Sequence, residues 1–229
     1  MGLLVARFLS LLLIKLYCRD FSSNFKFHHY VFKRLISFGG WVAVSNFISP
    51  IMSYFDRFIL ANKMGASMVG FYTAPSEAIS RISMLPSAVA RTIFPMLSSG
   101  EDDSGKIKIT SYILVLLFVI PVGCFCAYFS YDIMSLWLGN EYALKSYIIF
   151  QILILGFVFN SIAQIPFASI QSNGKSKTTA ILHLCELLPY LLLLYFLINK
   201  YGLIGAACAW TIRMFVDLLI LYIIDNYKR

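Results

Sequence analysis

Four polar side chains share one face of the apolar segment from residue 36 to residue 62, because they follow one another at spacings of three, four and four residues. They are Asn46, Ser49, Ser53 and Arg57. Polar and ionisable groups within a membrane span normally face the interior of a helix bundle or a water-filled path. The pattern therefore predicts a helix that lines a polar cavity rather than one that only anchors the chain.

Charged residues recur in or near the other apolar segments. With the two from the first segment they are Asp56, Arg57, Glu77, Arg81, Arg91, Arg213 and Asp217. Each charge costs roughly 2.5–3.5 kcal/mol on membrane-insertion scales, so a purely structural role is a strained explanation. Arginine binds phosphate or carboxylate through two parallel hydrogen bonds, which suits an anionic or amphiphilic substrate. A carboxylate beside the same cavity could pair with arginine or carry a coupling proton or Na⁺.

The composition indicates a bilayer as the solvent. Hydrophobic residues make up 59% of the chain and charged residues 13%, against about 25% charged in soluble domains. The net charge of +8 comes mostly from Lys and Arg between the apolar runs, so orientation in a membrane explains it and nucleic acid is not an expected partner. Membrane lipids are the expected partners of such a chain.

No motif points to an enzyme, a cofactor or a metal site. The cysteines lack zinc-ligand spacing, and the His28–His29 pair has no third ligand nearby. Nucleophile-elbow, phosphate-loop and zinc-protease motifs are missing from the sequence. We interpret His183 and Glu186, three residues apart, as a satisfied polar pair near the membrane edge.

We therefore expect an all-α fold, a polytopic membrane bundle of about six to seven transmembrane helices. Residues 1–17 predict a partial or doubtful transmembrane helix, since Arg7 and Lys15 interrupt it. Residues 18–35 are basic and aromatic and predict a cytoplasmic interfacial segment. Residues 36–229 predict a six-helix transmembrane bundle. Its spans are residues 36–62, 71–97, 107–129, 146–170, 179–198 and 203–224.

Prolines are expected to bend these spans. All seven lie in or at the edge of a span, and proline removes a helical hydrogen bond. Pro50 and Pro86 are the candidate hinges. Proline is also commoner in membrane helices generally, which accounts for some of the seven.

Glu77 and Arg81, four residues apart, can pair on one helix face.

Orientation follows from the Lys and Arg residues of the connecting segments. Ten lie in the segments on the side of residues 18–35, and three lie on the other side. Residues 18–35, the loop after residue 97, the loop at 171–178 and the C-terminus are therefore expected in the cytoplasm. Met1 then falls on the far side of the membrane, which indicates a missing N-terminal part or a first run that does not insert.

Two stretches carry a family resemblance. The run FGGWVAVSNFISPIMSYFDRFILANKMGASMVGFYTAPSEAISRISMLPSAVARTIFPMLS resembles the seventh and eighth helices of O-antigen and polysaccharide-repeat flippases. WLGNEYA and YGLIGAACAWTIRMFVDLLI are similar to the C-terminal half of the same proteins. These flippases belong to the multidrug/oligosaccharidyl-lipid/polysaccharide exporter superfamily. The resemblance implies one half of a MATE-like transporter built from two six-helix bundles around a central cavity, with an N-terminal half as a further partner.

The resemblance also implies a function. It is the transfer of undecaprenyl-diphosphate-linked oligosaccharide across the bacterial inner membrane by alternating access. Arg81, Arg91 and Arg213 would then attract the diphosphate or an acidic sugar. Asn46, Asn160 and Gln164 would contact hydroxyls, while Asp56, Arg57, Glu77 and Asp217 would pair or couple to an ion. The alternatives are a multidrug or lipid-precursor exporter of the same fold, or an inactive C-terminal fragment.

Overall fold

The computed structural model describes residues 9–10, 28–98 and 104–227, and all of them but a few turn residues are helical. The predicted helix at 1–17 and most of the segment at 18–35 therefore lie outside the described residues. The chain divides into two units, Met1–Ser37 and Phe38–Arg229. The functional features described below all belong to the second unit.

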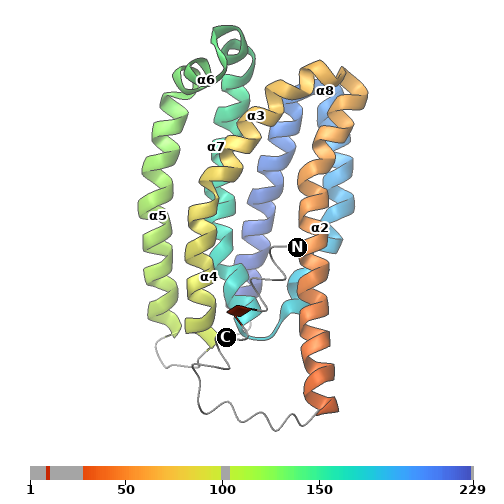
Figure 1. Cartoon of the computed structure of the whole chain (residues 1–229), viewed down its shortest axis with the longest axis vertical. Coiled ribbons are helices and arrows are strands. Elements are labelled where there is room, and N and C mark those ends of the chain that lie inside the picture. Colours follow the sequence, from red (N-terminus) through yellow and green to blue (C-terminus); the bar gives the residue numbers. More distant parts are fainter. Residues whose placement is uncertain (1–8, 11–27, 99–103, 228–229) are drawn as a thin grey trace. The chain divides into compact units, whose positions relative to one another are not determined.

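Each predicted span is helical, but the first long helix begins at His29, inside the segment 18–35 that was predicted to be interfacial. Their bounds are α2 His29–Met64, α3 Ala66–Ile82, α4 Met84–Ser98, α5 Ser104–Tyr128, α6 Ser130–Leu138, α7 Asn140–Ser172 and α8 Ser176–Tyr227 (Figure 1). Among the described residues, α2, α5, α7 and α8 are long and apolar enough to cross a membrane. Large apolar side chains such as Ile113 and Leu117 on α5 are exposed, as lipid-facing residues are. The prediction of an all-α polytopic membrane protein is confirmed.

A single glycine divides α8 into two antiparallel helices. Gly202 has φ 59° and ψ −130°, a conformation essentially restricted to glycine. A side chain at Gly205 would collide with the backbone carbonyl of Leu197, so the chain reverses too tightly for any larger residue there. The two predicted spans at 179–198 and 203–224 are therefore the two arms of α8.

The predicted span at 71–97 is also divided, into α3 and α4. The break lies at Ser83, and Pro86 is the third residue of α4. Pro86 has no N–H to donate to the carbonyl of Ile82, which explains why the helix restarts there. Figure 1 shows α3 running obliquely to α4. By contrast, α2 continues through Pro50, so only one of the two candidate hinges lies next to an interrupted helix.

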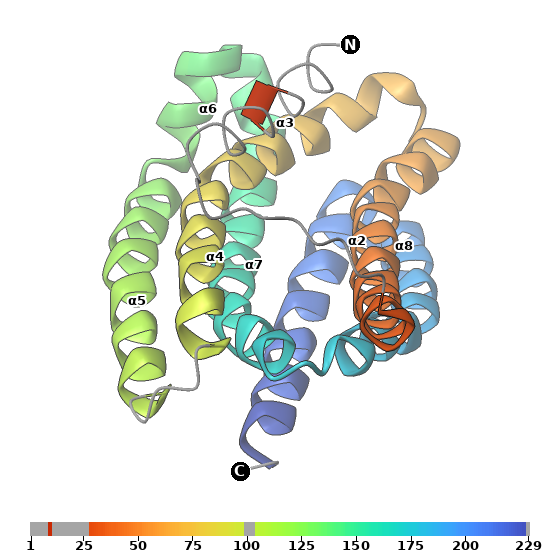
Figure 2. The same cartoon turned by 60° about the horizontal axis from the view of Figure 1, so that its bottom comes forward.

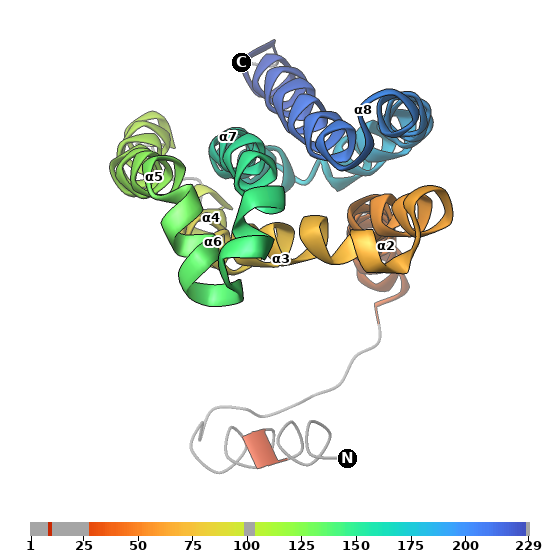
Figure 3. The same ribbon diagram turned by 90° about the horizontal axis from the view of Figure 1, so that it is seen from above.

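Helix α7 is the centre of the second unit. Seen end-on in Figure 3, it lies between α5 and the second arm of α8. Gly156 allows α7 and α8 to approach closely, because a Cβ there would lie 2.6 Å from Cε3 of Trp210. The hydroxyl of Thr211 donates to the carbonyl of Ile152 at 2.9 Å and joins the same two helices.

Helix α2 runs parallel to the first arm of α8. The Ser176 hydroxyl donates to the carbonyl of Phe38 at 3.3 Å near one end, and Lys63 Nζ donates to the Tyr195 hydroxyl at 3.4 Å near the other. Figure 2 shows this arm beside α2 and the other arm beside α7. The first arm of α8 thus packs beside α2 and the second arm beside α7, so that α2 and α7 lie on the two sides of a shared interior space.

Candidate functional site

A cleft of about 610 Å³ opens between α2, α3, α4, α7 and the second arm of α8. We call it the large cleft. The residues that line it include Ser49, Tyr54, Asp56, Arg57, Tyr72, Ser76, Glu77, Ser80, Ser83, Ser87, Arg91, Asn160 and Trp210. These hydroxyl, amide and charged groups give the large cleft a partly polar lining within otherwise apolar helices.

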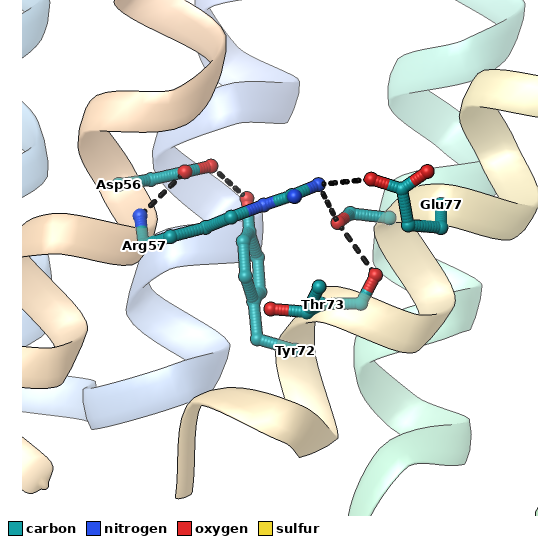
Figure 4. Close-up of polar contacts among 6 residues, drawn as sticks. Asp56, Arg57, Tyr72, Thr73 and Glu77 are labelled. Atoms are coloured by element: carbon teal, nitrogen blue, oxygen red, sulfur yellow. Dashed lines mark hydrogen bonds and ion pairs between the residues drawn. The ribbon is translucent and has the colours of Figure 1, made fainter. Parts of the chain in front are cut away.

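An ion pair between α2 and α3 lies at one side of the large cleft (Figure 4). Arg57 Nη2 lies 2.9 Å from Glu77 Oε1 and donates to the Ser76 hydroxyl at 3.0 Å. The adjacent Asp56 is buried and accepts hydrogen bonds from the Tyr72 hydroxyl and, at 2.6 Å, from the backbone N–H of Arg57. Glu77 therefore pairs across helices with Arg57, and its predicted pairing with Arg81 four residues on is wrong.

A row of serines continues from this ion pair along α3 and α4. Ser76, Ser80, Ser83 and Ser87 line the large cleft at spacings of four, three and four residues, and Arg91 follows. The Ser83 and Ser87 hydroxyls each donate to the backbone carbonyl four residues earlier, at 2.8 and 2.9 Å. Their oxygens are left as acceptors facing the cleft. Our reading of the sequence passed over this row, although its helical spacing was visible there.

A second space, the small cavity, adjoins the large cleft and has a volume of about 290 Å³. The two share Ser49, Asn160 and Trp210 as lining residues. The other residues that line the small cavity are Ser45, Asn46, Ala163, Gln164, Phe167, His183, Arg213, Met214, Asp217 and Leu221. It lies toward the end of the bundle that the sequence predicts to be cytoplasmic.

Charged groups are buried around the small cavity without hydrogen-bond partners among the described residues. Arg213 is 6% exposed and Asp217 is 8% exposed. Arg213 Nε and Nη1, Asp217 Oδ1, His183 Nδ1 and both Glu186 carboxyl oxygens are unpartnered. His183 stacks on Phe167, with ring centroids 5.7 Å apart. His183 and Glu186 do not bond to each other, so the interpretation of the two as a mutually satisfied pair is wrong.

The structure distributes the predicted site residues over both spaces. The large cleft receives Pro50, Asp56, Arg57, Glu77, Arg91 and Asn160. The small cavity receives Asn46, Asn160, Gln164, Arg213 and Asp217. Arg81 is exposed and lines neither space, and Pro86 is buried in α4 and also lines neither. The side chain of Ser53 lies outside the described residues. No group of three or more His, Cys, Asp or Glu residues within the described ranges could hold a metal ion.

Comparison with known proteins finds a matching family model and relatives named for polysaccharide biosynthesis or transport. The family model described as "polysaccharide biosynthesis protein" matches residues 1–146. A Shigella flexneri protein named as an O-antigen transporter is 46% identical over 224 residues, which cover 96% of this chain and 54% of that protein.

Two more distant relatives have related names. A Haloferax volcanii protein named as the low-salt glycan biosynthesis flippase Agl15 is 26% identical over 191 residues, 81% of this chain and 40% of its own. The Staphylococcus aureus capsular polysaccharide biosynthesis protein CapF is 26% identical over 193 residues, 82% of this chain and 48% of its own. The chain thus spans about half the length of these relatives, and no solved structure matches it. This chain belongs to the polysaccharide biosynthesis protein family, as the resemblance in its sequence predicts.

Proposed function

We propose that this chain forms one half of a flippase that moves an undecaprenyl-diphosphate-linked oligosaccharide across the bacterial inner membrane. The observation that carries the proposal is the large cleft, a space of about 610 Å³ lined by hydroxyl and charged groups within helices whose outer faces are apolar. The 46% identity to a protein named as an O-antigen transporter supports a glycan as the substrate. The proposed activity is transport and not catalysis.

The lining of the large cleft suits the two parts of such a substrate. Ser83 and Ser87 present acceptor oxygens to sugar hydroxyls. Arg91 has the charge and the planar geometry to bind a diphosphate. Asn160 lies where the large cleft meets the small cavity and can both donate and accept. The ion pair between Arg57 and Glu77 is the element that an arriving charged group would compete with.

A second bundle completes the proposed transporter. The chain covers 54% of the length of its Shigella flexneri relative, and the family resemblance implies a second six-helix bundle as the partner. The break between α3 and α4 beside Pro86 is the proposed bending point during alternating access, with Pro50 in α2 as the other candidate. The predicted cytoplasmic side is the side of the loop at 171–178.

Complementation of a flippase-null bacterial strain tests this function. The chain is expressed together with an N-terminal bundle, and surface polysaccharide is measured alongside the amount of protein in the membrane. Arg91→Ala is expected to reduce surface polysaccharide at least tenfold, and Arg81→Ala and Arg213→Ala test the other predicted arginines. Lys175→Ala, in the loop before α8, is the matched control and should have no effect.

Two outcomes would reject the proposal. One is a stable membrane protein that does not restore surface polysaccharide. The other is drug resistance conferred without any change in surface polysaccharide, which would select the multidrug exporter instead. Equal loss for Arg91→Ala and Lys175→Ala would reject the assignment of Arg91 alone.

A further inference from the structure

Two carboxyl groups and one guanidinium meet beside the small cavity, on the two arms of α8. Glu186 belongs to the first arm, and Arg213 and Asp217 belong to the second. The carboxyl groups of Glu186 and Asp217 lie within hydrogen-bonding reach of each other, and Arg213 is close enough to attract both. Both Glu186 oxygens and Asp217 Oδ1 lack any described donor. The cluster thus has two acceptor groups facing each other with no hydrogen atom between them.

The charges of the cluster do not balance when both acids are ionised. Two carboxylates and one guanidinium sum to one negative charge, and both Glu186 carboxyl oxygens and Asp217 Oδ1 are buried within the bundle. Two ionised carboxylates in contact also repel each other, and this repulsion is relieved when the pair holds one proton. One proton on the pair makes the cluster neutral and supplies the missing hydrogen bond.

No other described group around the cluster supplies the positive charge that would balance the two carboxylates. His183 stacks flat on Phe167, and its Nδ1 is buried without an acceptor, so an imidazolium there would have an unsatisfied N–H. Tyr190 lies with its ring 5.1 Å from the Arg213 guanidinium carbon and its hydroxyl unpartnered. From α2 come Ser45, Asn46 and the more distant Asp56, which is bonded to Tyr72; from α7 come Asn160 and Gln164. None of these brings a positive charge.

We propose that the cluster beside the small cavity holds one bound proton, shared between the carboxyl groups of Glu186 and Asp217, with Arg213 as their fixed counter-charge. Arg213 is then engaged by the two acids and does not bind the diphosphate of the substrate. This consequence rests on the proposed function, and it leaves Arg91 as the arginine of the large cleft that meets the substrate anion. The proton itself does not depend on the nature of the substrate.

Infrared difference spectroscopy of the purified chain near neutral pH tests the proposal, because a buried protonated carboxyl group has a stretching band of its own. Glu186→Gln and Asp217→Asn should each remove one protonated carboxyl group per chain, since the remaining acid then forms a neutral pair with Arg213. Arg213→Gln should do the opposite and add one, because two acids without a counter-charge both take up a proton. Glu141→Gln, at a side chain that is 91% exposed, is the control and should change nothing.

The proposal is overturned if neither acid substitution reduces the band, or if Arg213→Gln reduces it. Replacing choline chloride by sodium chloride should leave the wild-type band unchanged, and loss of the band in sodium would reassign the site to Na⁺. If Arg213→Gln does not fold, the two near-isosteric acid substitutions still decide. The spectra need no transport, so a chain that keeps the band but fails complementation would reject the proposed function and leave the proton site standing.

Discussion

Lys108, Ser169 and Asp225 join three helices at one end of the second unit, and removing this contact should destabilise the protein measurably. Lys108 Nζ of α5 lies 2.9 Å from both carboxyl oxygens of Asp225 in α8, and the Ser169 hydroxyl of α7 donates to Asp225 Oδ1 at 2.7 Å. The side chains of Lys108 and Asp225 are only 15% and 8% exposed. The pair therefore behaves as a buried ion pair and not as a surface one.

The magnitude follows from this burial. Removal of one partner of a buried pair costs about 3–5 kcal/mol, and because Lys108 keeps some access to solvent we expect about 3 kcal/mol for Asp225→Leu. Lys108→Met should cost a similar amount, since the Asp225 charge then keeps only the Ser169 hydroxyl. Replacement of both by apolar residues should cost about 1 kcal/mol, chiefly for the unpaired hydroxyl.

The assay is a double-mutant cycle on thermal or denaturant unfolding in one detergent. The two substitutions should show a coupling energy of about 5 kcal/mol, because the two single costs of about 3 kcal/mol each together exceed the double-variant cost of about 1 kcal/mol by that amount. Lys145 and Glu141 form the matched control, a pair at 3.6 Å with side chains that are 49% and 91% exposed. Its coupling should stay below about 0.5 kcal/mol. Equal couplings for the two pairs would refute the reasoning from burial.

Three further substitutions test the packing and the buried polar contacts. Gly156→Ala should cost about 1–3 kcal/mol of unfolding free energy because the added methyl meets the ring of Trp210, and Trp210→Leu should recover part of that loss. Gly202→Ala should cost about 1–3 kcal/mol, since φ 59° and ψ −130° are strained for any side chain, and an unchanged melting temperature would contradict the tight reversal. Tyr72→Phe should cost about 1–3 kcal/mol by removing a donor from the buried Asp56, measured by thermal unfolding with Tyr54→Phe, at an exposed residue, as control.

Most of the fold could be predicted from the sequence. Each long helix requires about 20 apolar residues to cross a bilayer, and such runs are visible without any tertiary information. The C-terminal ends of the predicted spans at 36–62 and 107–129 lie within two residues of Met64 and Tyr128, whereas α2 and α5 begin earlier than predicted, at His29 and Ser104. The break at Ser83 was not predicted as such, although Pro86 pointed to a bend within the same span.

Residue type indicated which side chains line the two spaces, but not which partners those side chains have. Polar and charged residues within apolar runs indicate a cavity because lipid excludes them. Ten of the predicted site residues, and Ser49 from the helix-face pattern, line the large cleft, the small cavity or both. The ten are Asn46, Pro50, Asp56, Arg57, Glu77, Arg91, Asn160, Gln164, Arg213 and Asp217. Arg81 shows the limit of this reasoning. It has the same residue type and a similar place in its span as the others, yet it is exposed and lines neither space.

The sequence by itself determined that helices cross a membrane and that polar groups lie among them, because both follow from the composition of single segments. The pairing of those groups was decided only by the tertiary structure. Glu77 bonds to Arg57 on α2 rather than to Arg81 four residues away, and Glu186 meets Asp217 because the chain reverses at Gly202. Helical periodicity specifies the face on which a side chain lies, but which helix covers that face depends on how the bundle packs.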